Sequence, residues 1–324
     1  MKKIKFIPVL AMAALLSACE LGGPSVKAPK FAKEGDKVEA AAFIEDALKA
    51  IKELEVYKAE PSYKDRFVKV NNSNSEEEFL KRGNKKVNQY SYKKSSDMTF
   101  EFDFDSYVAY GTMEEKVSST DKSTSSSSNR TANMKTSTYL QKVTHEGKNY
   151  FASVSKDSKK MMGYAEITEL TPEKALFESI YASGEKQYLT LTTAVSFMES
   201  EYPSFTDEEK AKYNFYKNGD VYTITYEDTR EGEYKYDDVI YYTTSNTSKM
   251  KLQYEIKGKD VYFRSSEEEI EIIDYKKTYY SYPESYFEGD HYEEKEVSYS
   301  ECSAKDKSVS LSAIDTTGFS FSTL

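Results

Sequence analysis

Histidine and cysteine, on which many metal and catalytic sites are built, are scarce in this sequence. There are two of each in 324 residues, and His145 and His291 lie far apart among acidic neighbours. Zinc and non-haem iron centres need several imidazole or thiolate ligands close together. We therefore interpret both histidines as surface residues and expect no metal site and no cofactor.

The motifs of the common enzyme classes are missing as well. The sequence has no G-x-S-x-G elbow, no phosphate-binding P-loop and no glycine-rich dinucleotide motif. Ser-x-x-Lys pairs begin at Ser91, Ser119, Ser153 and Ser183, but a chain rich in serine and lysine produces such pairs by chance. The companion motifs of penicillin-recognising enzymes are absent. We expect a protein that is not an enzyme; the alternative is an enzyme with a dispersed, acid-based site.

Positive charge and long apolar runs are also in short supply. Lysine and arginine number 45 against 55 aspartates and glutamates, a formal net charge of -10. Binding to a phosphate backbone requires clustered basic residues, so this balance argues against nucleic acid as a partner. The apolar run at residues 7–16 has ten residues, and a membrane-spanning helix needs about twice that number.

That run belongs to an ordered N-terminal arrangement. Three lysines precede it and the small residues Ser17 and Ala18 follow it, which is the layout of a secretory signal peptide over residues 1–18. The sequence LSAC at 16–19 resembles the lipobox of bacterial lipoproteins. The resemblance implies cleavage between Ala18 and Cys19 and a diacylglyceryl group on the sulfur of Cys19.

Lipidation at Cys19 implies where the protein is held. The acyl anchor would keep it in the cell envelope, at the outer face of the cell membrane, or in the outer membrane if the source is Gram-negative. Two or more acyl chains anchor stably where one is marginal. Residues 19–37 are rich in glycine, proline, alanine and lysine without a sustained period, so we interpret them as a flexible, lipidated tether.

The second cysteine, Cys302, then has no cysteine left for an intramolecular disulfide. Ser298, Ser300 and Cys302 fall on one face of an expected strand. We interpret Cys302 as a structural thiol, because no histidine lies near it in the sequence to activate it.

What the sequence does have is aromatic residues in alternating patterns. It contains 29 tyrosines and 17 phenylalanines but no tryptophan, and tyrosine suits half-buried sheet faces. The alternation of apolar and polar residues predicts strands. The segments are 87–92, 99–105, 148–154, 221–227, 251–257, 269–274 and 308–314. Asn218-Gly219 is the strongest hairpin signal, with weaker ones at 145–148 and 256–260, so we expect a largely antiparallel sheet.

Helices are predicted at a few places. Over residues 35–55, Asp36 is the expected N-cap, with Glu39 completing a capping box. The apolar stripe of this helix is Ala40, Ile44, Ala47, Leu48, Ile51 and Leu54. A helical insertion is expected later: residues 172–183 after Thr171, a segment near 190–200, and a short helix that Thr206 caps with Glu209.

Three polar stretches complete the picture. The serine- and threonine-rich run at 118–134 has almost no apolar residues, so we expect a flexible loop there. Asp103 and Asp105 share one strand face, and we interpret them as solvated carboxylates rather than as a calcium site. The acidic clusters at 265–271 and 288–296 are expected on charged sheet edges.

These observations predict the α+β class with predominantly antiparallel β structure. Residues 38–324 would form a single β-rich domain, a large curved sheet with the N-terminal helix and the helical insertion packed on it. This order resembles the architecture of Lol-type and mycobacterial lipoprotein carriers, in which helices close a curved sheet over an apolar cavity. The resemblance implies a membrane-anchored protein that binds or carries an apolar ligand such as a lipid. The alternative is a surface interaction protein that contacts envelope polymers, another protein or a host.

Overall fold

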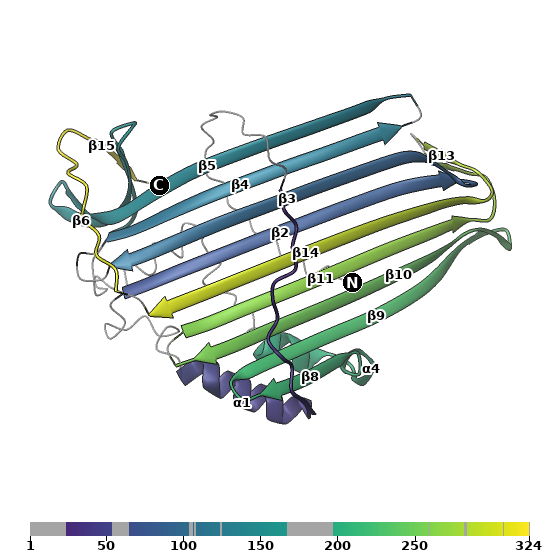
Figure 1. Cartoon of the computed structure of the whole chain (residues 1–324), viewed down its shortest axis with the longest axis horizontal. Helices are drawn as coiled ribbons and strands as arrows, with labels where there is room; N and C mark the ends of the chain where they lie inside the picture. Colours follow the sequence, from purple (N-terminus) through teal and green to yellow (C-terminus); the bar gives the residue numbers. More distant parts are fainter. Residues whose placement is uncertain are drawn as a thin grey trace.

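The fold is built around one open sheet of thirteen strands (Figure 1). The computed structural model describes residues 24–53, 65–103, 106, 108–123, 125–166, 197–258, 260–281, 284–306 and 308–323. In spatial order the strands are β1 (Asp36–Val38), β8 (Tyr213–Asn218), β9 (Val221–Tyr236), β10 (Val239–Lys257), β11 (Asp260–Tyr275), β14 (Asp290–Asp306), β2 (Asp65–Arg82), β3 (Lys85–Asp103), β4 (Val108–Ser123), β5 (Ser127–His145), β6 (Lys148–Ser155), β7 (Lys160–Glu166) and β15 (Ser320–Thr323).

The predicted antiparallel character of the sheet is confirmed. Neighbouring strands run antiparallel except β15 and β7, which are parallel. The hairpin predicted at Asn218-Gly219 joins β8 to β9 through a turn at Gly219 and Asp220. Gly219 has a φ of 58°, a left-handed conformation that glycine adopts without strain. A separate two-stranded sheet pairs β12 (Tyr279–Ser281) with β13 (Glu284–Tyr286).

The two faces of the large sheet differ because side chains alternate along each strand. On one face Phe215, Ile224 and Leu252 lie opposite one another and are buried. We call it the helix face, because helix α1 (Ala40–Glu53) packs on it. The opposite face carries Gln253 and is crossed by an extended segment of chain, so we call it the strap face.

Helix α1 packs on the sheet through part of the predicted stripe and through Phe43, which the predicted stripe did not include. The ring of Phe43, 1% exposed, lies 5.0 Å from that of Phe215 and 5.8 Å from that of Tyr222. Burying one such side chain contributes about 1.5–3 kcal/mol. Ala47 is also buried, and Ile44 is half-buried against the same core. The side chain of Ile51 and all of Leu54 lie outside the described part of the structure.

The expected cap of this helix was wrong. Asp36 lies in β1, opposite Lys217 of β8, and the helix begins at Ala40. The amide of Phe43 donates to the carbonyl of Glu39, which places Glu39 at the cap. Pairing with β8 satisfies the backbone around Asp36 through a sheet ladder, so this segment does not need the capping box.

The expected loop at 118–134 was also wrong. Strands β4 and β5 pass through it, and Ser118 pairs with Thr131 in a continuous ladder. The preceding strand β3 offers β4 an edge along its full length, and serine and threonine join a ladder without requiring burial. The low hydropathy of residues 118–134 led to the prediction of a loop, but this hairpin is held by backbone pairing and not by burial in a core.

Two further expectations about strands need correction. Residues 308–314 are extended but join no ladder among the described residues. The acidic clusters at 265–271 and 288–296 lie in β11 and β14, which pair with each other near the middle of the sheet rather than at its edge. On the strap face, ion pairs such as Lys295 with Glu268, 2.6 Å apart, offset some of the repulsion.

The helical insertion is described only in part. Phe197–Glu201 forms one π-helical turn (η3), followed by a 3-10 turn (η4, Tyr202–Ser204) and by α4 (Asp207–Lys210). The capping box of α4 is confirmed: the Glu209 amide donates to Thr206 Oγ1 at 3.2 Å, and the Thr206 amide donates to Glu209 Oε2 at 2.8 Å. The expected helix at 172–183 lies outside the described residues.

Candidate functional site

A segment at each end of the described chain lies across the strap face. The first, which we call the N-terminal strap, comprises residues 29–35 and is part of the extended chain that crosses the strands in Figure 1. The amide of Ala32 donates to Gln253 Oε1 at 2.7 Å, and Gln253 Nε2 donates to the carbonyl of Ala32 at 3.0 Å. Gln253 is fully buried, so this double hydrogen bond is made away from water. The flexible tether expected over residues 19–37 is therefore fixed to the sheet at Ala32.

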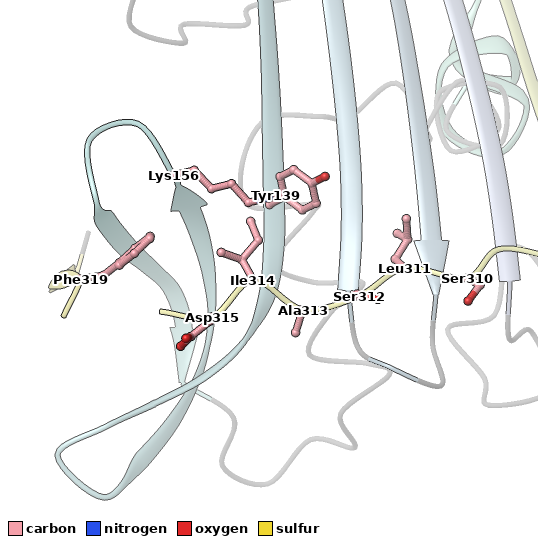
Figure 2. Close-up of a pocket in the computed structure, with 9 residues that line it drawn as sticks. All are labelled: Tyr139, Lys156, Ser310, Leu311, Ser312, Ala313, Ile314, Asp315 and Phe319. Atoms are coloured by element: carbon pink, nitrogen blue, oxygen red, sulfur yellow. The ribbon is translucent and has the colours of Figure 1, made fainter. Parts of the chain in front are cut away.

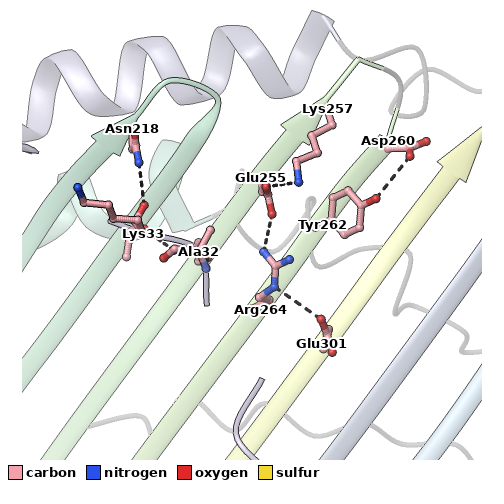
Figure 3. A network of polar contacts seen from close by, with 11 residues as sticks. Ala32, Lys33, Asn218, Glu255, Lys257, Asp260, Tyr262, Arg264 and Glu301 are labelled. Carbon is pink, nitrogen blue, oxygen red and sulfur yellow. Dashed lines mark hydrogen bonds and ion pairs between the residues drawn. The ribbon is translucent and has the colours of Figure 1, made fainter. Parts of the chain in front are cut away.

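Further contacts hold the N-terminal strap. Asn218 Nδ2 donates to the carbonyl of Lys33 at 3.2 Å (Figure 3). Lys251 forms an ion pair with Glu34. The Lys251 ammonium also lies 4.6 Å from the centre of the Phe31 ring. These contacts come from β8 and β10, so the strap is tied to two strands.

A polar network lies beside the strap (Figure 3). Arg264 Nη1 donates to Glu255 Oε2 at 2.9 Å, and Lys257 Nζ lies 2.6 Å from Glu255 Oε1. Arg264 Nε is 3.6 Å from Glu301 Oε1. Burial alone would raise the pKa of Glu255, but the hydrogen bonds from Lys257 and Arg264 outweigh it and hold that pKa below its ordinary value. The network is charge-compensated and joins β10, β11 and β14.

The second segment, which we call the C-terminal strap, comprises residues 308–319. The amide of Ile314 donates to Gln141 Oε1 at 2.7 Å, and Gln141 Nε2 donates to the Ile314 carbonyl at 2.9 Å. The amide of Leu311 donates to Asp103 Oδ2 at 2.9 Å. Asp103 is 6% exposed, so its interpretation as a solvated carboxylate was wrong; Asp105 lies outside the described residues.

A groove lies between the C-terminal strap and the sheet (Figure 2). Its volume is about 530 Å³, within the range of small-molecule sites. The lining consists of Tyr139, Lys156, Ser310, Leu311, Ser312, Ala313, Ile314, Asp315 and Phe319. The Lys156 ammonium lies 5.4 Å from the centre of the Tyr139 ring. The groove therefore combines apolar walls with one ammonium group and one carboxylate.

A carboxylate cluster lies on the helix face, away from both straps. Glu76, Glu78 and Glu294 have carboxylate oxygens within 4.8 Å of one another. Burial, the hydrogen bond with Glu76 and the charge of Glu294 raise the pKa of Glu78 to about 7. Tyr292 Oη donates to Glu294 Oε2 at 2.9 Å. This cluster takes up a proton near neutral pH.

The residues singled out in the sequence are scattered in the structure. Ala18 and Cys19 lie outside the described residues. Cys302 is buried in the main core, where a structural thiol is expected. The ring of His145 stacks on Phe321 at 4.2 Å, and His291 Nδ1 lies 2.8 Å from Asp274 Oδ1 on another part of the sheet.

The sequence analysis missed both glutamines that hold the straps. Gln141 and Gln253 each follow a leucine near the C-terminal end of a long strand, in YLQKV and KLQYE. Both occupy positions of the alternating pattern where an ordinary exposed polar residue also fits. A glutamine at these positions was visible in the sequence, but the pattern around it does not distinguish a buried glutamine from an exposed one.

The chain has no match among family models or among curated proteins. Similar solved structures include the outer membrane protease OmpT from Escherichia coli, with 7% identity over 74% of this chain and 95% of that chain and a TM-score of 0.22. OccK7 (OpdD) from Pseudomonas aeruginosa has 8% identity over 74% and 99%, with a TM-score of 0.18. The translocator domain of the autotransporter NalP from Neisseria meningitidis has 9% identity over 80% and 96%, with a TM-score of 0.14. TM-scores this low carry no argument about shared fold or function.

One sequence-based expectation disagrees with the first of these neighbours. The sequence predicted a protein that is not an enzyme, and the first of these neighbours is a protease, so we do not keep that expectation. The likeness is too weak to assign a reaction to this chain. Among the helices that the structure describes, none is both long enough and apolar enough to cross a membrane.

Proposed function

We propose that this chain is an envelope lipoprotein that binds an amphipathic ligand, with an apolar body and an anionic end, in the groove beneath the C-terminal strap. The observation that carries the proposal is the composition of the groove. Leu311, Ile314 and Phe319 give it apolar walls, and Lys156 places one ammonium beside Tyr139. An apolar body gains from leaving water while an anionic end pairs with the lysine.

The N-terminal strap supports the membrane location. If Cys19 is acylated, Pro24 lies five positions further along the chain, and an extended chain of that length spans about 18 Å. Gln253 and Gln141 occupy the same face by the register of the intervening strands, so both straps lie on the strap face. An anchored Cys19 would thus hold the strap face, with the groove, close to the lipid surface from which an amphipathic ligand would come.

A direct binding experiment tests the groove. The full chain, extracted in a nonionic detergent, is titrated with cis-parinaric acid, a fluorescent long-chain fatty acid. We expect Lys156→Gln to weaken binding about tenfold, because the carboxylate loses its ammonium partner. Lys160→Gln, which removes an exposed lysine outside the groove lining, is the matched control and should bind like the unaltered chain. No binding by the unaltered chain, or equal binding by both variants, would contradict the proposal.

Acylation of Cys19 is tested separately. Cells that express the full chain are fed radiolabelled palmitate, and the protein is recovered and examined for label. We expect label in the unaltered chain and none in Cys19→Ser, while Cys302→Ser stays labelled. Label that persists in Cys19→Ser would contradict the lipobox interpretation.

A second candidate function, a surface interaction protein, is favoured by one observation. The exposed large apolar side chains of the described residues concentrate near the turn between β9 and β10 and the small β12-β13 sheet. Five of the six lie there, namely Tyr234, Tyr236, Val239, Tyr280 and Phe287, and the sixth, Met162, lies in β7. Exposed tyrosines are typical of protein contact surfaces. Co-sedimentation of the full chain with isolated cell envelopes tests it: Tyr236→Ser with Tyr280→Ser should reduce the bound fraction, and equal sedimentation would argue against this surface.

A further inference from the structure

The groove beneath the C-terminal strap is formed mostly by the strap itself. Seven of the nine residues that line it belong to residues 310–319 (Figure 2). Only Tyr139 of β5 and Lys156 of the β6-β7 turn come from the sheet side. The groove therefore exists only while the strap is docked, and a ligand that fills it contacts both the strap and the sheet.

The strap packs on a part of the sheet that lies outside the main core. It follows β14 and reaches β15 by crossing the strands between β14 and β7, which are β2, β3, β4, β5 and β6 (Figure 1, yellow). Ile314 and Phe319 of the strap, with Phe321 of β15, are partly buried against a small cluster of Val143, Ala152, Val154 and Met161. This cluster is separate from the core beneath α1. The strap can therefore leave the sheet without exposing the main core.

The far end of the strap is fixed by the short strand β15. This strand pairs in parallel with β7 over residues 320–323, and the amide of Ser320 donates to the carbonyl of Lys159 at 3.0 Å. The side chains of Ser320, Ser322 and Thr323 are exposed, and that of Phe321 is half-buried. Beyond its backbone pairing, β15 is therefore held on the sheet mainly by Phe321.

Phe321 lies in a seat that fits an aromatic ring. Its ring stacks on that of His145, with 4.2 Å between the centres, and lies 5.0 Å from the ring of Tyr150. Gly163 of β7 leaves room for it, because a Cβ at that position would lie 2.7 Å from Phe321 Cζ. Phe321 does not line the groove. It can therefore hold the strap in place without contacting what the groove contains.

We propose that residues 308–323 form a lid that closes over the ligand, with Phe321 as its latch. The inference rests on the proposed function, because the ligand is the amphipathic one assigned to the groove. When the lid is open, the ligand reaches Tyr139 and Lys156 from the side that the strap otherwise covers. A ligand in the groove contacts the strap, so it binds the closed state more tightly and shifts the lid toward closure. By linkage, whatever holds the lid closed raises the affinity for the ligand.

A double-mutant cycle at the latch tests the lid through the affinity of the full chain for cis-parinaric acid. Phe321→Ala removes the ring and Gly163→Ala displaces it from its seat, so we expect each substitution to weaken binding about fivefold. The double variant should bind no more weakly than Phe321→Ala, because the added methyl group then has no ring to displace. Thr323→Ala, which removes an exposed side chain of the same strand, is the matched control and should bind like the unaltered chain.

Hydrogen exchange measures the lid directly. We expect the amides of Leu311, Ile314 and β15 to exchange faster in Phe321→Ala, and to exchange more slowly in the unaltered chain once cis-parinaric acid is added. Unchanged exchange in β10 establishes that each variant is folded. A chain that does not bind cis-parinaric acid would contradict the proposed function and the lid with it. Binding that leaves exchange in the lid unchanged, or equal affinity of Phe321→Ala and Thr323→Ala, would leave the groove as a binding site and overturn the lid alone.

Discussion

The side-chain amide of Gln253 binds the backbone of Ala32 as a neighbouring strand would. One residue of β10 donates to the carbonyl and accepts from the amide of a residue 221 positions away. Gln141 of β5 repeats the arrangement with Ile314, 173 positions away. The sheet thus fixes segments at both ends of the described chain on the same face.

We expect Gln253→Ala to release the N-terminal strap. The substitution removes both hydrogen bonds to Ala32 and the one from Gln253 Nε2 to Thr223 Oγ1. Leaving such buried groups without partners costs about 1–3 kcal/mol. Urea unfolding should show this loss, and limited proteolysis should cut residues 24–35 faster. Gln89→Ala, at an exposed site of β3, is the control; equal proteolysis of the two variants would contradict the clamp.

Gln141→Ala should lower both the free energy of unfolding and the affinity for the ligand. Loss of the bonds to Ile314 detaches the middle of the C-terminal strap, which forms one wall of the groove. We expect weaker binding of cis-parinaric acid together with a lower free energy of unfolding. Gln253→Ala, which acts on the other strap, should leave the affinity unchanged. Unchanged affinity in Gln141→Ala would show that the strap does not shape the binding site.

Glu78 should make stability fall as pH rises toward neutrality. Its pKa is raised from 4.5 to about 7 in the folded state, so between these values the folded protein binds a proton that the unfolded chain has released. Its stabilising contribution is complete below pH 4.5 and is lost as pH rises through 7. Urea unfolding from pH 5 to 8 should show a smaller decline for Glu78→Gln than for the unaltered chain.

Two other glutamates, Glu267 and Glu77, define what the Glu78 experiment should show. Burial raises the pKa of Glu267 to about 7 as well, so Glu78→Gln should remove only part of the decline. Glu77→Gln changes the next residue, whose side chain lies on the strap face 3.9 Å from Lys93, and should leave the decline unchanged. An identical pH dependence in Glu78→Gln and Glu77→Gln would show that the carboxylate cluster does not titrate as described.

Asp290→Asn should destabilise the end of the sheet where β2 meets β14. Arg82 donates to both carboxylate oxygens of Asp290 at 3.0 and 2.9 Å, and the Phe287 amide donates to Oδ2 at 2.9 Å. Asp290 is 2% exposed but the Arg82 side chain is 45% exposed, so we expect a loss of about 1–3 kcal/mol rather than more.

Acid titration checks the same pair. Burial alone would raise the pKa of Asp290, but Arg82 and the Phe287 amide outweigh it and lower that pKa below 3.8. The stability that Asp290 contributes is therefore present above pH 3.8 and is lost as pH falls through its lowered pKa, a loss that Asp290→Asn should not show. Glu166→Gln, which breaks the exposed pair with Lys148, should destabilise the protein less than Asp290→Asn. Equal losses in the two variants would contradict a special role for Asp290.

Several elements of the fold were predictable because they depend on neighbours in the sequence. Alternation along KLQYEIK places Leu252, Tyr254 and Ile256 on one face, and that face is the core side of β10. The signal at Asn218-Gly219 predicts the hairpin of β8 and β9, whose two-residue turn begins at Gly219 and uses the backbone freedom of glycine. The capping box likewise depends on neighbours in the sequence, because it joins Thr206 to Glu209, three residues further on.

The sequence by itself determined strands, turns and the order of signals around Cys19, since each depends on a short stretch of chain. Only the tertiary structure decided that residues 29–35 and 308–319 lie across the sheet, that Asp103 is buried and that 118–134 forms a hairpin. The physical reason is that these outcomes depend on backbone partners far away in the sequence. A glutamine or an aspartate in an alternating pattern looks solvated until the fold brings a distant amide to it.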